Sequence, residues 1–268
     1  MKISRGKFIK KGILASIGLV LFDSLWFEKY VIDWNYYDVS KNGNKLKIIQ
    51  ISDLHFDELR LFHKSIAKKI NLLKPDLIFI TGDSVDRTDK IEGLNSFLKL
   101  IDRSIRKFAI TGNWEYWGDV DLEKLAKVYD DNNCELLINE NRTITIRDRK
   151  VSVIGIDDFV GGNADFHKAT KGLEPGDTTI VLSHCPEHRD KMRTQKGKVH
   201  IDLVLSGHTH GGQITFLGFV PFKPQGSGRY LKGWYTDYEP KMYISKGIGT
   251  SMLPIRLGAR AEMVEIDI

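Results

Sequence analysis

Along residues 45–133, short runs of consecutive apolar residues alternate with segments whose apolar residues recur at helical spacing. Three short apolar runs predict buried strands, at residues 46–51, 77–81 and 107–111. Segments with apolar residues at helical spacing follow these runs in turn, at residues 60–73, 91–101 and 120–133. A repeated strand–loop–helix order indicates parallel strands joined by right-handed crossovers.

After residue 134 the pattern is dominated by strands. The candidates are residues 135–138, 142–147, 151–156, 178–183, 202–206, 213–216, 241–246 and 262–267, with a short helix near 186–193. Helices that precede a set of strands, in a chain long enough for one full core, favour two sheets packed together with helices outside. We therefore predict an α/β fold, a four-layer α-β-β-α sandwich of two mixed sheets.

The N-terminal 27 residues have a separate character. Residues 1–11 contain five basic side chains and no acidic one, and an apolar run over 12–22 follows, ended by Asp23. This layout is typical of an export signal or a retained signal-anchor, which would place the following domain outside the cytoplasm. An amphipathic or buried N-terminal helix of a cytosolic protein is the alternative. We expect a membrane-attached segment over 1–27, a tether over 28–44 and one domain over 45–268.

Charge changes the picture only at that N-terminus. The chain has 40 Lys and Arg against 35 Asp and Glu, and the five basic residues of 1–11 account for the whole excess. The remaining chain is neutral overall, so the pI near 9.0 does not indicate a nucleic-acid partner. The sequence does not indicate an oligomeric state.

Candidate chemistry is concentrated at the ends of predicted strands. Seven side chains with oxygen or nitrogen ligand atoms directly follow five apolar runs: Asp53, His55, Asp83, Asn113, His184, His208 and His210. The carboxyl ends of parallel strands meet at one edge of a sheet, where ligands bind. A mixed oxygen and nitrogen set suits Mn²⁺, Zn²⁺ or Fe. One Asp-x-His means little, but five such clusters in order are poorly explained by chance.

The series Asp53-x-His55, Gly82-Asp83, Gly112-Asn113, His184 and Gly207-His208-x-His210 resembles the calcineurin-like metallophosphoesterase superfamily. The resemblance covers residues 45–268, and it extends to a bacterial branch whose members carry export signals or membrane anchors. It implies a phosphoric ester hydrolase with two divalent ions (Mn, Zn, Fe or mixed). The substrate would be a phosphorylated small molecule or a lipid-linked phosphate.

The resemblance also implies a division of the seven ligands. One ion would be held by Asp53, His55, Asp83 and His210, and the other by Asp83, Asn113, His184 and His208, so that Asp83 bridges them. Asp83, Asn113 and His208 would form the catalytic core around a metal-bridging hydroxide that attacks phosphorus in line.

The third motif departs from the family pattern. Family members usually have a histidine after Gly-Asn that protonates the leaving group, and here Trp114 follows Asn113, with Glu115 next. Loss of a general acid removes about 10²–10⁴ in rate for poor leaving groups. We therefore expect a preference for good leaving groups, or a Trp114 that stacks on substrate; the alternative is that Trp114 only packs in the site wall.

Other segments are candidates for substrate binding. Trp114, Glu115 and Arg229 are the expected substrate contacts, with Arg229 in a Gly-rich loop suited to phosphate. The apolar segment 214–222 is either a buried strand and turn or a surface for an acyl chain or membrane. Two alternatives to a general phosphoesterase are a lipid-linked pyrophosphate hydrolase of the UDP-2,3-diacylglucosamine type and a non-enzymatic, metal-stabilised scaffold.

Overall fold

The computed structural model describes residues 4–40, 45–194 and 199–268. Its strands form two six-stranded sheets, in the orders β1-β12-β2-β3-β4-β5 and β10-β11-β9-β8-β7-β6. Both sheets are mixed, because β12 runs antiparallel to β2 in the first, and β10 and β6 run antiparallel to their neighbours in the second. The predicted architecture of two packed mixed sheets is confirmed.

The first sheet contains β1 (Asp33–Asp38), β2 (Lys47–Ile51), β3 (Leu77–Thr81), β4 (Arg106–Ile110), β5 (Cys134–Leu136) and β12 (Glu262–Asp267). The second contains β6 (Glu140–Ile146), β7 (Arg149–Gly155), β8 (Thr178–Leu182), β9 (Leu203–Ser206), β10 (Gly233–Tyr235) and β11 (Met242–Ile244). The helices are α1 (Arg5–Phe22), α2 (Glu28–Tyr30), α3 (Leu61–Leu73), α4 (Ile91–Leu98), α5 (Asn113–Trp117), α6 (Leu122–Asp131), α7 (Phe166–Thr170) and α8 (His188–Thr194), with shorter or irregular turns η1 (Asp23–Phe27), η2 (Thr88–Lys90) and η3 (His210–Gly212).

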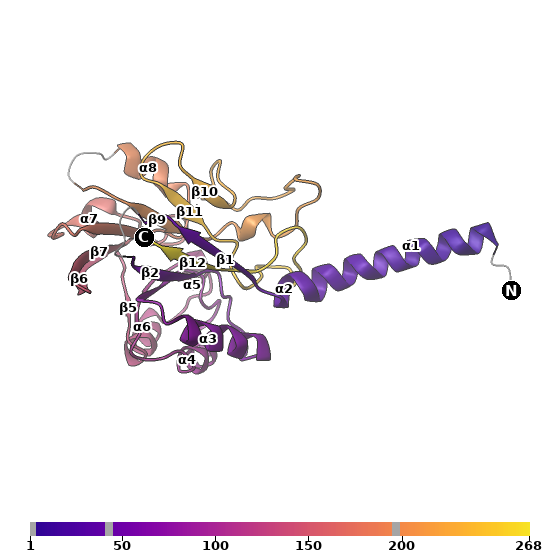
Figure 1. The fold of residues 1–268 in the computed structure, drawn as a ribbon, viewed down its shortest axis with the longest axis horizontal. Coiled ribbons are helices and arrows are strands. Elements are labelled where there is room, and N and C mark those ends of the chain that lie inside the picture. Colours follow the sequence, from indigo (N-terminus) through magenta and orange to yellow (C-terminus); the bar gives the residue numbers. More distant parts are fainter. Residues whose placement is uncertain (1–3, 41–44, 195–198) are drawn as a thin grey trace.

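Three apolar clusters separate the layers. The central cluster fills the space between the sheets with side chains such as Ile48, Phe79, Val153 and Leu205. A second packs α3, α4 and α6 against the outer face of the first sheet, and a third packs α7 and α8 against the second sheet. Figure 1 shows the two helix groups on opposite sides of the paired sheets. Strands 77–81 and 178–182 are buried on both faces, and each contains consecutive apolar residues, Leu77–Ile80 and Ile180–Leu182, as is typical of parallel central strands.

The segment expected as a tether contributes to the sheet. Within 28–44, residues 33–38 form β1, which pairs in parallel with β12, while residues 41–44 lie outside the described residues. Residues 33–38 are polar and aromatic, so they contain no apolar run from which a strand would be predicted. β1 is an edge strand with one side open to solvent, which is compatible with this composition.

Helix α1 projects from the body and buries no side chain (Figure 1). Its exposed apolar residues include Phe8, Ile13, Leu14 and Ile17. Among the described helices, none combines the length and apolar character needed to cross a membrane.

The predicted strand over 213–216 is wrong. Only isolated bridges are formed there, and Phe216 is 67% exposed and Leu217 93% exposed. A local apolar pattern cannot distinguish a buried strand from an exposed apolar loop, and these residues form an exposed loop.

Candidate dinuclear metal centre

The seven predicted ligand residues meet at one edge of the paired sheets. Each follows the carboxyl end of a strand: β2, β3, β4, β8 or β9. The backbone at these ends is unusual, because five of the seven residues have left-handed φ angles between 41° and 73°; they are Asp53, His55, Asp83, His208 and His210. This conformation costs a non-glycine residue about 1–3 kcal/mol, and such strain concentrates where side chains must be aimed.

Two glycines allow the loops to approach each other. A Cβ at Gly112 would lie 2.2 Å from Oδ1 of Asp83, and a Cβ at Gly207 would lie 1.9 Å from Oγ of Ser52. Both distances are far below van der Waals contact, so only glycine fits at these positions.

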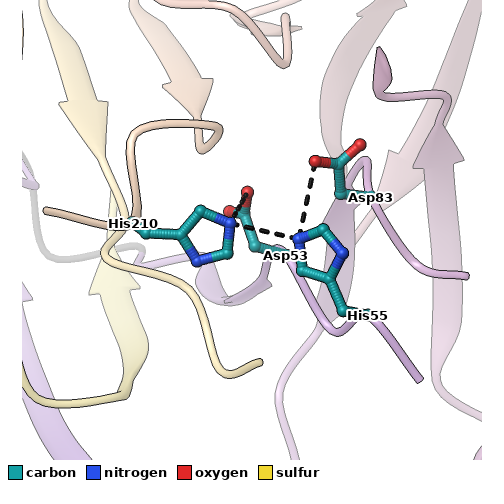
Figure 2. Close-up of side chains that lie close together, drawn as sticks. All are labelled: Asp53, His55, Asp83 and His210. Atoms are coloured by element: carbon teal, nitrogen blue, oxygen red, sulfur yellow. Dashed lines mark hydrogen bonds and ion pairs between the residues drawn. The ribbon is translucent and has the colours of Figure 1, made fainter. Parts of the chain in front are cut away.

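One ligand cluster consists of Asp53, His55, Asp83 and His210 (Figure 2). Nε2 of His55 lies 3.1 Å from Nε2 of His210 and 3.6 Å from Oδ2 of Asp83. Nε2 of His210 lies 3.6 Å from Oδ1 of Asp53. Four ligand atoms from three separate loops therefore point at one small volume.

A second cluster shares Asp83 and adds His184 and His208. Nε2 of His184 lies 3.2 Å from Oδ2 of Asp83 and 3.2 Å from Nδ1 of His208. Asn113 is 2% exposed, and its Oδ1 has no hydrogen-bond partner. A buried amide oxygen without a partner is costly, which is consistent with an oxygen kept free as a ligand atom.

The spacing of these atoms fits bound divalent ions. Ligands at about 2.0–2.1 Å from one ion lie about 3.0–3.4 Å from each other at ordinary coordination angles. The observed 3.1 Å between the His55 and His210 nitrogens and 3.2 Å between the His184 and His208 nitrogens fall in this range. The residues present therefore fit a centre of two ions with Asp83 shared.

Three of the four histidines have their outer nitrogen fixed by an acceptor. Nδ1 of His55 lies 2.6 Å from Oδ1 of Asp86, Nδ1 of His184 lies 2.7 Å from the Thr81 carbonyl, and Nε2 of His208 lies 2.7 Å from the Gln225 carbonyl. These acceptors keep a ring proton on the outer nitrogen, so the inner nitrogen is the one that would bind an ion once it has lost its own proton.

His210 differs from the other three, because its Nδ1 faces Nη2 of Arg256 at 3.3 Å. Arg256 is fully buried and donates to the carbonyls of Lys246, Gly249 and Ala259. It thereby joins the loop after β11 to the ligand loop after β9. Burial, His55 and Arg256 together hold the pKa of His210 well below its usual range, so the ring is neutral.

The carboxylate shared by both clusters is kept ionised. Burial acts to raise the pKa of Asp83, but His184, His55 and His208 lower it below its ordinary value. Burial acts to lower the pKa of His184, but Asp83 and Asp53 raise it well above normal. The metal-free centre is thus a network of buried carboxylates and imidazoles that compensate one another's charge.

Glu115, expected to contact substrate, is placed in the interior. It is 1% exposed, and its carboxylate accepts hydrogen bonds from four backbone N–H groups, those of Asp83, Ser84, Val85 and Gly112. Burial and the nearby Asp83 raise the pKa of Glu115 to about 7. Its contacts indicate that it holds the β3 and β4 loops together.

The two remaining predicted contacts have different locations. Trp114 lies in the site wall: its backbone N–H donates to Oδ1 of Asp83 at 2.9 Å, and its indole Nε1 donates to Oγ of Ser251 at 3.1 Å. Arg229 instead pairs with Asp237 and lies over the Tyr238 ring, so it does not join the ligand residues. The expected phosphate contact at Arg229 rested on the composition of the Gly-rich loop. Composition does not specify where an arginine side chain points.

Sequence reasoning missed Asp86, Gln213 and Arg256. Asp86 lies three residues after Asp83 in the same loop, and Gln213 lies three residues after His210. Their roles depend on tertiary contacts with His55, Ser251 and His210, for which the sequence carries no local signal.

Comparison with known proteins agrees with this geometry. The profile of the calcineurin-like phosphoesterase family matches residues 46–212, which include all seven ligand residues. This chain belongs to that family.

Several relatives share most of the chain. It is 31% identical to the uncharacterized metallophosphoesterase YkoQ of Bacillus subtilis, over 82% of each chain. It is 27% identical to the uncharacterized metallophosphoesterase YkuE of the same organism, over 98% of this chain and 96% of the relative. It is 29% identical to the phosphodiesterase YaeI of Escherichia coli, over 91% of this chain and 88% of the relative.

Proposed function

We propose that this protein is a two-metal phosphoesterase that hydrolyses phosphoester or pyrophosphate bonds by in-line attack of an activated water. The observation that carries the proposal is the pair of ligand clusters that share Asp83. Two divalent ions held there would supply the activated water and neutralise charge on the phosphate oxygens. The name of the relative YaeI, a phosphodiesterase, supports the same reaction class.

The roles of the chain's own residues follow from their contacts. Asp53, His55 and His210 hold one side of the centre, and Asn113, His184 and His208 hold the other. The Trp114 backbone N–H fixes one oxygen of Asp83. An indole cannot deliver a proton to a leaving group as an imidazole can, and the Trp114 Nε1–H is already donated to Ser251. We infer a preference for leaving groups that depart without protonation, such as aryl oxides or phosphates.

The test uses purified full-length protein with Mn²⁺, Zn²⁺ or Fe²⁺ and bis-p-nitrophenyl phosphate. We expect hydrolysis with at least one ion, and its loss in Asn113→Ala and His208→Ala. His200→Ala is the matched control, because His200 is an exposed histidine outside both clusters. A folded protein that is inactive with every ion tried would instead favour a metal-stabilised scaffold.

A lipid-linked pyrophosphate hydrolase of the UDP-2,3-diacylglucosamine type is a second candidate. The observation that favours it is the exposed apolar loop beside the ligand loop of His208 and His210, which includes Phe216, Leu217 and Phe219. An assay with that substrate, compared with the water-soluble diester under the same conditions, tests it. Turnover of the diester alone would exclude it.

We also propose that α1 attaches the protein to a membrane surface, with the domain on the extracytoplasmic side. Exposed apolar side chains of α1 support the attachment, and the basic residues at its N-terminal end support retention of that end on the cytoplasmic side. Ile13→Glu with Ile17→Glu should abolish cosedimentation with anionic vesicles without unfolding, because neither residue is buried. Gln substitution of two exposed lysines, Lys127 and Lys168, is the control. A C-terminal reporter on the full chain that is active only in the cytoplasm would overturn the orientation.

A further inference from the structure

An apolar cavity opens directly onto the candidate metal centre. Its volume is about 560 Å³, within the range of about 300–1,000 Å³ typical of ligand sites. Asp83, Asn113, His208 and His210 lie on its wall. The rest of the wall is largely aromatic and aliphatic, with Trp114, Trp117, Ile214, Phe222, Met252 and Leu253 as its main members. A molecule in this cavity would therefore lie beside the atoms that face a bound phosphate.

Hydrogen bonds hold the wall in place. The side chain of Gln213 donates to the carbonyls of Ser251 and Leu253, both at 2.9 Å, and accepts from the Ser251 N–H at 2.8 Å. The Trp114 indole donates to the Ser251 hydroxyl. The loop that carries Met252 and Leu253 is thus fixed against the ligand loop, so the protein's own hydrogen bonds shape the apolar wall.

A second cavity of about 680 Å³ lies on the other side of Trp114 and Trp117, which line both. It reaches the centre at His55, and its wall contains basic and acidic side chains in equal number: Lys29, Arg60, Arg87 and Lys90 with Asp57, Glu58, Asp86 and Asp119. The centre therefore has an apolar cavity on the His208 side and a charged, overall neutral cleft on the His55 side.

We infer that the substrate is an amphiphilic phosphodiester, whose alkyl or acyl chain binds in the apolar cavity while its polar part faces the charged cleft. This inference rests on the proposed phosphoesterase function. A wholly polar substrate would leave the apolar wall in contact with water. Phe222 and Met252, which are 67% and 82% exposed, would then remain large apolar side chains in solvent with no apolar partner from the substrate. Burial of a chain beside them is favourable in proportion to the area covered.

The test is a series of alkyl p-nitrophenyl phosphodiesters with methyl, butyl and octyl chains, each below its critical micelle concentration. Water adds to phosphorus, the P–O bond to p-nitrophenolate breaks with its electron pair, and the proton passes to solvent. The leaving group is the same throughout, so only the chain varies. A CH₂ group that enters an apolar site gains about three- to fourfold in kcat/KM. We expect at least about a thirtyfold rise from methyl to octyl, since part of the chain lies at the mouth.

Two phenylalanines of the same loop provide a matched pair of variants. Phe222 is 67% exposed and lines the cavity, whereas Phe219 is 68% exposed and does not. Phe222→Ser should lower the octyl-to-methyl ratio of kcat/KM at least about fivefold, and Phe219→Ser should leave it unchanged.

The two ideas fail in different ways. A flat chain-length series in a protein that hydrolyses bis-p-nitrophenyl phosphate overturns the chain site and leaves the phosphoesterase proposal intact. An equal fall of the ratio in both serine variants also overturns it, because it would indicate general adsorption by the apolar loop. Inactivity towards every diester, with any of the ions, is a failure of the phosphoesterase proposal itself.

Discussion

Oδ1 of Asp86 lies 2.6 Å from Nδ1 of His55, on the opposite side of the ring from the metal-facing Nε2. Burial acts to lower the pKa of His55, but the Asp86 hydrogen bond and the Asp83 charge raise it to about 9. In the metal-free protein at neutral pH, the ring is therefore protonated. An ion held by His55 would take the place of the Nε2 proton, and Asp86 would hold Nδ1–H and so keep the ring in orientation.

Replacement of this carboxylate should weaken metal binding. We expect Asp86→Asn to lower the affinity for Mn²⁺ about 10–100-fold, because the outer partner of a ligand histidine contributes that much. Calorimetric titration of metal-free protein measures it. Asp89→Asn is the control, since Asp89 pairs with Arg87 at the surface of the same region. Equal affinity in Asp86→Asn and wild type would contradict the role assigned to Asp86.

We expect the carboxylate of Glu115 to contribute mainly to the stability of the fold and not directly to catalysis. Its removal leaves four backbone N–H groups without their acceptor, and each buried unsatisfied donor costs about 1–3 kcal/mol. We expect Glu115→Ala to lower the free energy of unfolding by at least about 3 kcal/mol in EDTA, and Glu115→Gln by less, because one carbonyl oxygen remains. Urea denaturation measures both. Glu123→Ala, on the exposed face of α6, is the control, and a substrate-binding Glu115 would instead change KM with little change in stability.

A histidine at position 114 should broaden the choice of leaving group. We expect Trp114→His to raise kcat/KM about tenfold or more for diesters with alkyl leaving groups, since general acid catalysis is worth about 10²–10⁴ when well placed. The rate for p-nitrophenyl esters should not rise. Trp117→His is a matched control, because Trp117 lines the same cavity but does not follow the Asn113 ligand. If alkyl esters show no gain, leaving-group selectivity has another origin.

Acid should destabilise the protein through a histidine outside the centre. Burial, with a smaller effect of Arg60, lowers the pKa of His63 to about 4. The unfolded chain binds this proton near pH 6.5 and the folded chain does not, so stability is full above pH 6.5 and falls as the pH drops towards 4. His63→Gln should reduce this loss, as measured by urea midpoints in EDTA at pH 7 and 4.5. His200→Gln, at an exposed position, should match wild type, and identical pH profiles for all three proteins would exclude the effect.

The sequence was sufficient to predict which side chains meet at the candidate centre, because strand-end placement is a local property. Asp53, Asp83 and His184 each follow a short apolar run, and parallel strands must deliver such residues to one edge. Their division into two clusters needed the family resemblance. The left-handed backbone at Asp53 and His210 has only a weak sequence signal, since Asp and His adopt this conformation more often than most residues but far less readily than glycine.

Other features depend on partners distant in sequence. β1 pairs with a strand more than 200 residues away, so its edge position could not be read from residues 33–38 alone. Glu115 looked like a polar residue beside a ligand, and only the position of the Asp83 loop shows that its carboxylate is enclosed by backbone N–H groups. Exposure of Phe216 and Phe219 is likewise a property of the folded surface, not of the run of apolar residues.

The pairing of β1 with β12 determines when the first sheet can be completed during synthesis of the chain. β1 has β12 as its neighbour in the sheet, and β12 is formed by Glu262–Asp267. While the ribosome is still adding the middle of the chain, residues 33–38 have no strand to join. The segment that follows the N-terminal helix therefore takes its place in the first sheet only after the last strand of the chain has been synthesised.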